Sequence, residues 1–163
     1  MGALHFTGPL FSKVLYKMSF TYTCTRALTF ENLFQAAKEG HVAAVLRLLA
    51  LGAEANSRNK GDLQTPLHWA AAKDQYGAID ALVSGGADVE ARDVGGWTPL
   101  LMASYRGQVS ALECLCEHGA NISAVDWEHD TALHCAAHVG HTAAALALVE
   151  AHMLESTLCS AFL

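Results

Sequence analysis

Apolar residues recur at three- and four-residue spacing in four short segments of the chain, at residues 43–50, 76–84, 109–117 and 142–150. This spacing predicts helices that each bury one side. The positions expected to be buried are Val45, Leu48 and Leu49, then Ile79, Leu82 and Val83, then Leu112, Leu115 and Cys116, and finally Leu146, Leu148 and Val149. An alanine-rich stretch precedes each segment, so we expect a closely packed first helix before each of these second helices.

A short motif marks the expected start of three of the first helices. Thr-Pro-Leu-His at residues 65–68 recurs 33 residues later as Thr-Pro-Leu-Leu at 98–101, and again as Thr-Ala-Leu-His at 131–134. A threonine side chain can cap a helix, and proline is favoured at the first helical position. A fixed period of this length predicts one helix-pair unit stacked on copies of itself.

Small residues mark the expected helix ends. Gly107 and Gly140 suit the left-handed residue that follows a helix, whereas Asp74 stands there in the second unit, so that helix must end in another way. Gly-Ala pairs follow the second helices at residues 52–53, 86–87 and 119–120. Where the fourth unit should have this pair, it has Ala151-His152, and residues 158–163 are mostly apolar.

Together these motifs resemble the ankyrin repeat over roughly residues 30–150. The resemblance implies an all-α solenoid of helix-turn-helix repeats linked by short β-hairpins. We place the repeats at about residues 30–63, 64–96, 97–129 and 130–152, after an irregular N-terminal extension (1–29) and before an apolar C-terminal tail (153–163).

The predicted hairpins differ from one another. Gly96 matches the family pattern at its turn, whereas Leu63 and His129 depart from it. The first hairpin, residues 57–64, is one residue longer than the others, so we expect a bulge near residues 60–62.

Composition limits the classes of function. The net charge is −6, and because residues 1–30 contribute three basic and no acidic residues, the remainder carries −9. An acidic repeat body argues against non-specific binding of nucleic acid. The chain has no apolar run long enough to span a membrane. Its five cysteines form no Cys-x-x-Cys pair and are expected to be thiols in the cytoplasm or nucleus. Mitochondrial targeting by the N-terminal extension is a minority alternative.

Two patterns could indicate chemistry. His134, His138 and His141 lie at helical spacing beside Cys135, as in a zinc site, but His134 and His141 fill recurring repeat positions. Cys114 and Cys116 also fill repeat positions, and no base or oxyanion partner accompanies them. We therefore predict no metal site, no cofactor and no enzymatic activity.

Asn56 resembles asparagines that are hydroxylated in some ankyrin hairpins. The alternative is that its side chain satisfies backbone groups of the hairpin.

In this family, partners contact the hairpin tips and the exposed side of the first helices, which together line a concave groove. Matching positions give the expected partner-binding residues Trp97, Tyr105, Arg106, Trp127, Glu128, Lys73, Lys60, Asp62 and His138. Tryptophan, tyrosine and arginine dominate interface energetics. Alternatively, Trp97 and Trp127 pack on neighbouring hairpins and shield the backbone. Trp69 shares its repeat position with Met102 and Cys135 and is expected in the inter-repeat core.

We therefore predict a non-catalytic protein–protein interaction module or adaptor that binds a protein partner through the concave face. Two alternatives stay open. One is a compact regulatory inhibitor of a protein kinase, which rests on analogy of fold alone. The other is a truncated isoform or fragment of a larger ankyrin-containing protein, which the apolar C-terminal residues favour.

Overall fold

The computed structural model describes residues 32–161, with side chains described as far as Leu154. Within this part, eight helices form four pairs: α2 (Leu33–Glu39) and α3 (Val42–Ala50), α4 (Pro66–Ala72) and α5 (Tyr76–Ser84), α6 (Pro99–Arg106) and α7 (Val109–Glu117), and α8 (Ala132–Val139) and α9 (Thr142–Ala161). The predictions for residues 1–29, including targeting, lie outside the described residues.

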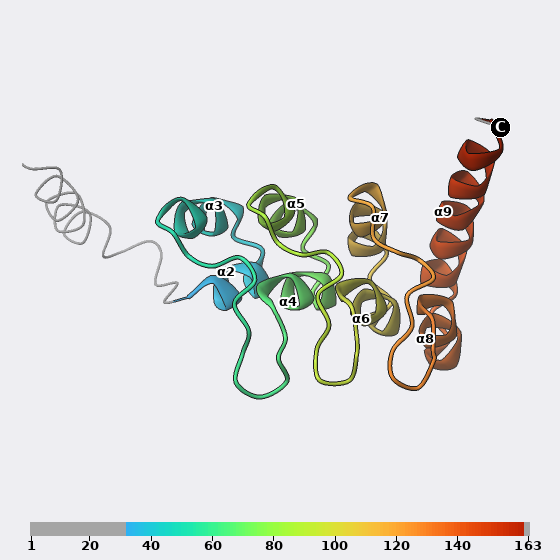
Figure 1. Cartoon of the computed structure of the whole chain (residues 1–163), viewed down its shortest axis with the longest axis horizontal. Coiled ribbons are helices and arrows are strands. Elements are labelled where there is room, and N and C mark those ends of the chain that lie inside the picture. The colour runs from blue at the N-terminus through green and yellow to red at the C-terminus, as the bar shows by residue number, and fades with distance from the viewer. Residues whose placement is uncertain (1–31, 162–163) are drawn as a thin grey trace, which may run out of the picture. The chain divides into compact units, whose positions relative to one another are not determined.

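The helix pairs stack in sequence order. The first helices α2, α4, α6 and α8 pack against one another in one row, and the second helices α3, α5, α7 and α9 form a second row. Three long loops connect consecutive pairs and project beyond the row of first helices (Figure 1). This arrangement confirms the predicted all-α repeat solenoid.

The threonine motif begins the first helices as predicted. The Thr98 hydroxyl accepts a hydrogen bond from the backbone N–H of Leu101, 3.3 Å away. In α4 the imidazole Nδ1 of His68 accepts from the Thr65 backbone N–H at 3.2 Å, so the motif's histidine completes the cap. α2 lacks the motif and uses Asn32, whose side chain accepts from Gln35 N–H.

The first helices end in the left-handed conformation. Gly40, Gly107 and Gly140 have φ of 72°, 70° and 87°, which confirms the role expected for the last two. Asp74 adopts the same conformation with φ of 58°. Its carboxylate accepts a hydrogen bond from Ala111 N–H at 2.8 Å, in the first turn of α7. Asp74 therefore follows the first helix of the second unit and caps the second helix of the third unit.

The loops reverse direction through short backbone contacts. Asp93 N–H donates to the Trp97 carbonyl at 3.0 Å, and Asp126 N–H donates to the Asp130 carbonyl at 3.2 Å. In the first loop the matching bond joins Asn59 to Gln64, so the extra residue lies between these two, as predicted. Within residues 32–161 the β pairing is limited to the single bridge between Val125 and Thr131, so these hairpins are too short to form strands.

The turn position that Gly96 occupies in the second loop has a positive φ in all three loops. Gly96 itself has φ of 76°, and Leu63 and His129 are held at 56° and 67° at the equivalent positions. L-residues are strained in this region, so the two departures from the family pattern are sites of local backbone strain.

The fourth unit differs from its prediction. α9 continues to Ala161 instead of ending near residue 150, because the glycine that would leave the helix in a left-handed conformation is replaced. Leu148 is buried, but Leu146 and Val149 are 64% and 46% exposed. Their assignment to a buried stripe is wrong, since no further helix pair covers this side of α9 within the described residues. No helix in the same range is long and apolar enough to cross a bilayer.

Candidate functional site

The surface formed by the three loops and the exposed side of the first helices, here called the hairpin face, carries the predicted partner-binding residues. Exposed side chains among these are Tyr105, Arg106, Trp127, Glu128, Lys73, Lys60, Asp62 and His138, and Trp97 is partly buried. Side chains and backbone of consecutive loops are in direct contact here, so these residues stand on a connected surface rather than on independent loops.

Trp127 lies at the turn of the third loop. The residue is 64% exposed, yet its indole N–H donates to the Val94 carbonyl of the preceding loop at 2.9 Å. The ring also covers Gly96, where an added Cβ would come within 2.7 Å of it. The Arg92 guanidinium lies 5.6 Å from the ring centre, within cation–π range. Trp127 therefore shields the neighbouring loop and also presents a large aromatic surface.

Trp97 is fixed through its backbone and its ring. Its backbone N–H donates to the Asp93 carboxylate at 3.0 Å, and its backbone carbonyl lies 2.9 Å from the imidazole Nε2 of His68 in the preceding repeat. The Tyr105 ring meets the Trp97 ring edge-on, with centroids 5.2 Å apart and planes at 80°. The structure thus brings the Trp97 and Tyr105 rings into contact.

Trp69 was expected in the core, and this assignment is wrong in part. The side chain is only half-buried, and the Lys38 ammonium lies 5.1 Å from its ring centre. Its neighbours His68, Ala70 and Ala71 are buried, whereas the indole of Trp69 stays partly exposed.

Arg92 is a further residue that sequence reasoning missed. Its guanidinium donates to the Val125 carbonyl at 2.6 Å and to the Gly96 carbonyl at 3.0 Å. Arg58 makes the matching contact one repeat earlier, with the Arg92 carbonyl at 2.7 Å. These arginines share one repeat position, so comparing that position between repeats could have found them. They bind consecutive loops to each other.

Asn56 bridges the first and second loops. Its side-chain N–H donates to the Gly86 carbonyl at 3.0 Å, and its side-chain oxygen accepts from Asp88 N–H at 2.7 Å. Glu90 repeats the second contact by accepting from Asn121 N–H at 2.8 Å. This is the backbone-satisfying arrangement expected in the structural alternative, and hydroxylation of Asn56 stays a prediction.

The histidine-rich fourth repeat spreads its side chains over separate structural contacts. The His134 Nδ1 lies 2.9 Å from the Thr131 hydroxyl, and the His141 ring packs over Gly107. Among the residues that the structure describes, no three His, Cys, Asp or Glu side chains are grouped so that they could hold a metal ion.

Two cysteines are buried as free thiols. Cys114 and Cys135 are 0% and 5% exposed, and burial raises the pKa of each thiol to about 11. Nearby carboxylates act in the same direction. Since the thiolate is the nucleophile, neither cysteine is activated at neutral pH.

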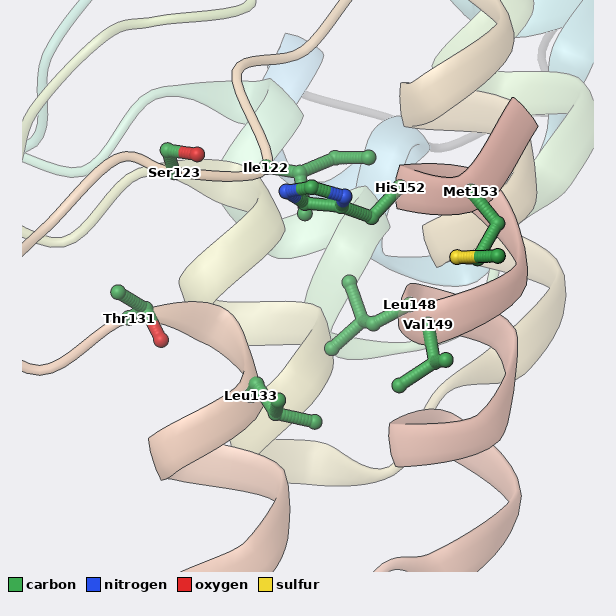
Figure 2. Close-up of a pocket in the computed structure, with 8 residues that line it drawn as sticks. All are labelled: Ile122, Ser123, Thr131, Leu133, Leu148, Val149, His152 and Met153. Carbon is green, nitrogen blue, oxygen red and sulfur yellow. The ribbon is translucent and has the colours of Figure 1, made fainter. Parts of the chain in front are cut away.

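One hollow lies between α8, α9 and the third loop. Its volume is about 360 Å³, and its lining is mostly apolar. Figure 2 shows Leu148 and Val149 of α9 on one side and Leu133 of α8 on the other.

Comparison with known proteins agrees with this architecture. A family model described as ankyrin repeats (three copies) matches residues 33–126 and again residues 77–157. No curated protein matches the chain significantly.

Proposed function

The chain belongs to the ankyrin-repeat family, whose members generally act as protein–protein interaction modules, and we propose that this protein binds a protein partner through the hairpin face. The proposed contact residues are Trp97, Tyr105, Arg106, Trp127, Glu128, Lys73, Lys60, Asp62 and His138. In this account the protein is a non-catalytic adaptor, in keeping with a family that is typically non-catalytic.

One observation carries the proposal: exposed aromatic rings stand on the hairpin face in fixed positions. Trp127 keeps 64% of its surface exposed while its indole N–H is held by the Val94 carbonyl. Tyr105 is 42% exposed while its ring is held by Trp97. An anchor that is already ordered loses little conformational entropy on binding. Large, ordered aromatic side chains are the residues that most often dominate an interface.

Charge on the hairpin face would determine which partner is accepted. Lys73 and Arg106 end two neighbouring first helices and are both exposed, whereas Glu128 and Asp130 are exposed at the third loop. Such rim charges affect association rate and specificity more than affinity. We therefore expect a partner with acidic groups toward the first helices and basic groups toward the third loop.

We also propose that the protein works in the cytoplasm or nucleus. The support is chemical: Cys114 and Cys135 are buried thiols, and reducing compartments preserve thiols.

The proposal is tested by affinity capture with matched baits. One bait carries Trp127→Ala, a second carries Lys73→Ala and Arg106→Ala, and the control carries Leu46→Ala. Leu46 is an exposed apolar side chain on α3, in the row of second helices, so it matches Trp127 in character but not in location. A true partner is recovered by the wild type and the control and is depleted with both hairpin-face baits.

Stability is measured for every bait, because the structure gives Trp127 intramolecular contacts. Loss of its indole hydrogen bond and ring packing is expected to cost about 1–2 kcal/mol. The Lys73/Arg106 bait changes exposed charges and is expected to keep wild-type stability within about 0.5 kcal/mol. Recovery of the same partners by all four proteins would contradict the proposal.

A further inference from the structure

Arg92 connects the second loop to the third loop through hydrogen bonds and through a ring contact. Its hydrogen bonds to the Val125 and Gly96 carbonyls both leave from one guanidinium nitrogen, Nη1. The carbon at the centre of the same guanidinium lies within cation–π range of the Trp127 ring. One half-buried side chain therefore fixes the backbone just before the turn of the third loop and also contacts the exposed ring at that turn.

Two further contacts of Trp127 are made with the second loop. Its backbone N–H donates to the Gly95 carbonyl at 3.3 Å, which is long for such a bond, and its indole N–H donates to the Val94 carbonyl at 2.9 Å. Trp127 is exposed, so water competes for the indole N–H and the net gain from that bond is modest. The orientation of the ring therefore depends on how firmly the third loop is held against the second, which is where Arg92 acts.

The same arginine position in the first loop lacks the ring contact. Arg58 occupies the repeat position of Arg92 and donates to the Arg92 carbonyl at 2.7 Å. In the second loop, however, Val94 stands at the repeat position of Trp127. Arg58 therefore joins two loops without an aromatic ring at the matching place, whereas Arg92 joins two loops and contacts an exposed indole.

We propose that Arg92 is a positioning residue of the hairpin face, which holds the Trp127 indole in the orientation that the protein partner contacts. This inference rests on the proposed function, in which Trp127 anchors the interface. A tryptophan side chain has three staggered χ1 rotamers. If the indole were spread equally over them, about one third of the molecules would be ready to bind, and the apparent Kd would rise by about threefold.

Arg92 acts through Trp127 and not through the partner in this account. Its Nη1 is taken by two backbone carbonyls and its guanidinium lies against the indole, so its charge is used inside the protein. Lys73 and Arg106, by contrast, are exposed at the ends of two first helices. Because one residue acts through the other, substitutions of Arg92 and Trp127 should have non-additive effects on partner binding.

The orientation of Trp127 is measured in the protein alone by fluorine NMR. The chain has three tryptophans, so labelling with fluorotryptophan gives one resonance for each, assigned by Trp→Phe substitutions. In Arg92→Gln, which removes the cation and Nη1, the Trp127 resonance should shift while the Trp69 resonance stays in place. Arg92→Lys keeps a cation with several donors and should shift the Trp127 resonance less.

The matched control is Arg58→Gln, which makes the same change at the same repeat position and removes an inter-loop hydrogen bond. It should move the Trp127 resonance less than Arg92→Gln does. Circular dichroism and thermal unfolding check that the variants are folded at the temperature of the NMR measurement. An unchanged Trp127 resonance in Arg92→Gln and Arg92→Lys, or an equal shift in Arg58→Gln, overturns the proposal.

The effect on binding is measured by isothermal titration calorimetry with one protein recovered by affinity capture. Arg92→Gln should weaken the Kd by about threefold and should cause no further loss in protein that already carries Trp127→Ala. A further loss would place Arg92 in the contact itself and overturn its positioning role. An unchanged Kd for Trp127→Ala contradicts the proposed function, whereas an unchanged Trp127 resonance contradicts this inference alone.

Discussion

Replacing His129 with glycine should stabilise the protein. His129 is exposed and held at φ of 67°, the position that Gly96 fills in the preceding loop. The left-handed conformation costs an L-residue about 1–2 kcal/mol. Glycine removes this strain, but it loses about 0.5–1 kcal/mol more in conformational entropy on folding, which offsets part of the gain. The net gain expected for His129→Gly is therefore about 0.5–1 kcal/mol, or roughly 1–4 °C in Tm.

Asp74→Gly is the matched comparison, because Asp74 has nearly the same backbone strain, with φ of 58°. Its carboxylate, however, accepts the Ala111 N–H at 2.8 Å and caps α7. Losing such a cap costs about 1 kcal/mol, which cancels or exceeds the relief of strain. The same kind of substitution at the same backbone angle should thus stabilise at one site and not at the other.

Equilibrium urea unfolding followed by far-ultraviolet circular dichroism measures both variants. We expect a higher midpoint for His129→Gly with an unchanged m value, and an unchanged or lower midpoint for Asp74→Gly. A lower midpoint for His129→Gly, or an equal rise in both variants, would refute this expectation.

Three further predictions follow from buried or crowded groups. Gly96→Ala should lower stability by about 2 kcal/mol or more in urea unfolding, because it forces alanine to φ of 76° and brings a Cβ within 2.7 Å of the Trp127 ring; wild-type stability would contradict the loop packing. Burial lowers the pKa of His68 in the folded state, so its contribution to stability is complete above about pH 6.5 and is lost as pH falls toward the folded pKa. Urea midpoints at mildly acidic and neutral pH should show a smaller decline for His68→Gln than for the wild type, and equal declines would count against His68 as the source. Burial raises the pKa of the Cys114 and Cys135 thiols to about 11, so both should react with iodoacetamide far more slowly in the folded than in the unfolded chain. Mass spectrometry of peptides measures the two rates, and equal rates would contradict the burial of these thiols.

Much of the fold follows from local signals that recur with the repeat. Thr98 and Pro99 predict where a helix begins, and Gly107 predicts where it ends, because capping depends on neighbouring backbone groups. The length of α9 was not predicted, since the boundary was taken from the earlier repeats. Leu146 was assigned to a buried stripe from its spacing alone, although Asp80 and Glu113 mark that repeat position as exposed.

The candidate site was predictable in part. Trp97, Tyr105 and Trp127 stood out because they are large aromatic residues at positions that the repeat leaves variable. Several contacts that hold the two tryptophans come from residues 29 to 35 positions away in the chain, such as Arg92 on Trp127 and His68 on the Trp97 carbonyl. Contacts of this kind depend on how one repeat stacks on the next, and residue type at a single position does not reveal them.

The most direct test of the central claim is the affinity of one captured partner for purified wild-type and Trp127→Ala protein. Isothermal titration calorimetry would measure both Kd values at a temperature where each protein is folded, with Leu46→Ala as the control. If Trp127 anchors the interface, we expect Trp127→Ala to weaken the Kd by about 30-fold, corresponding to roughly 2 kcal/mol. The Kd of Leu46→Ala should be unchanged. An unchanged Kd for Trp127→Ala would mean that the exposed indole serves only to hold neighbouring loops together, and binding through the hairpin face would be contradicted.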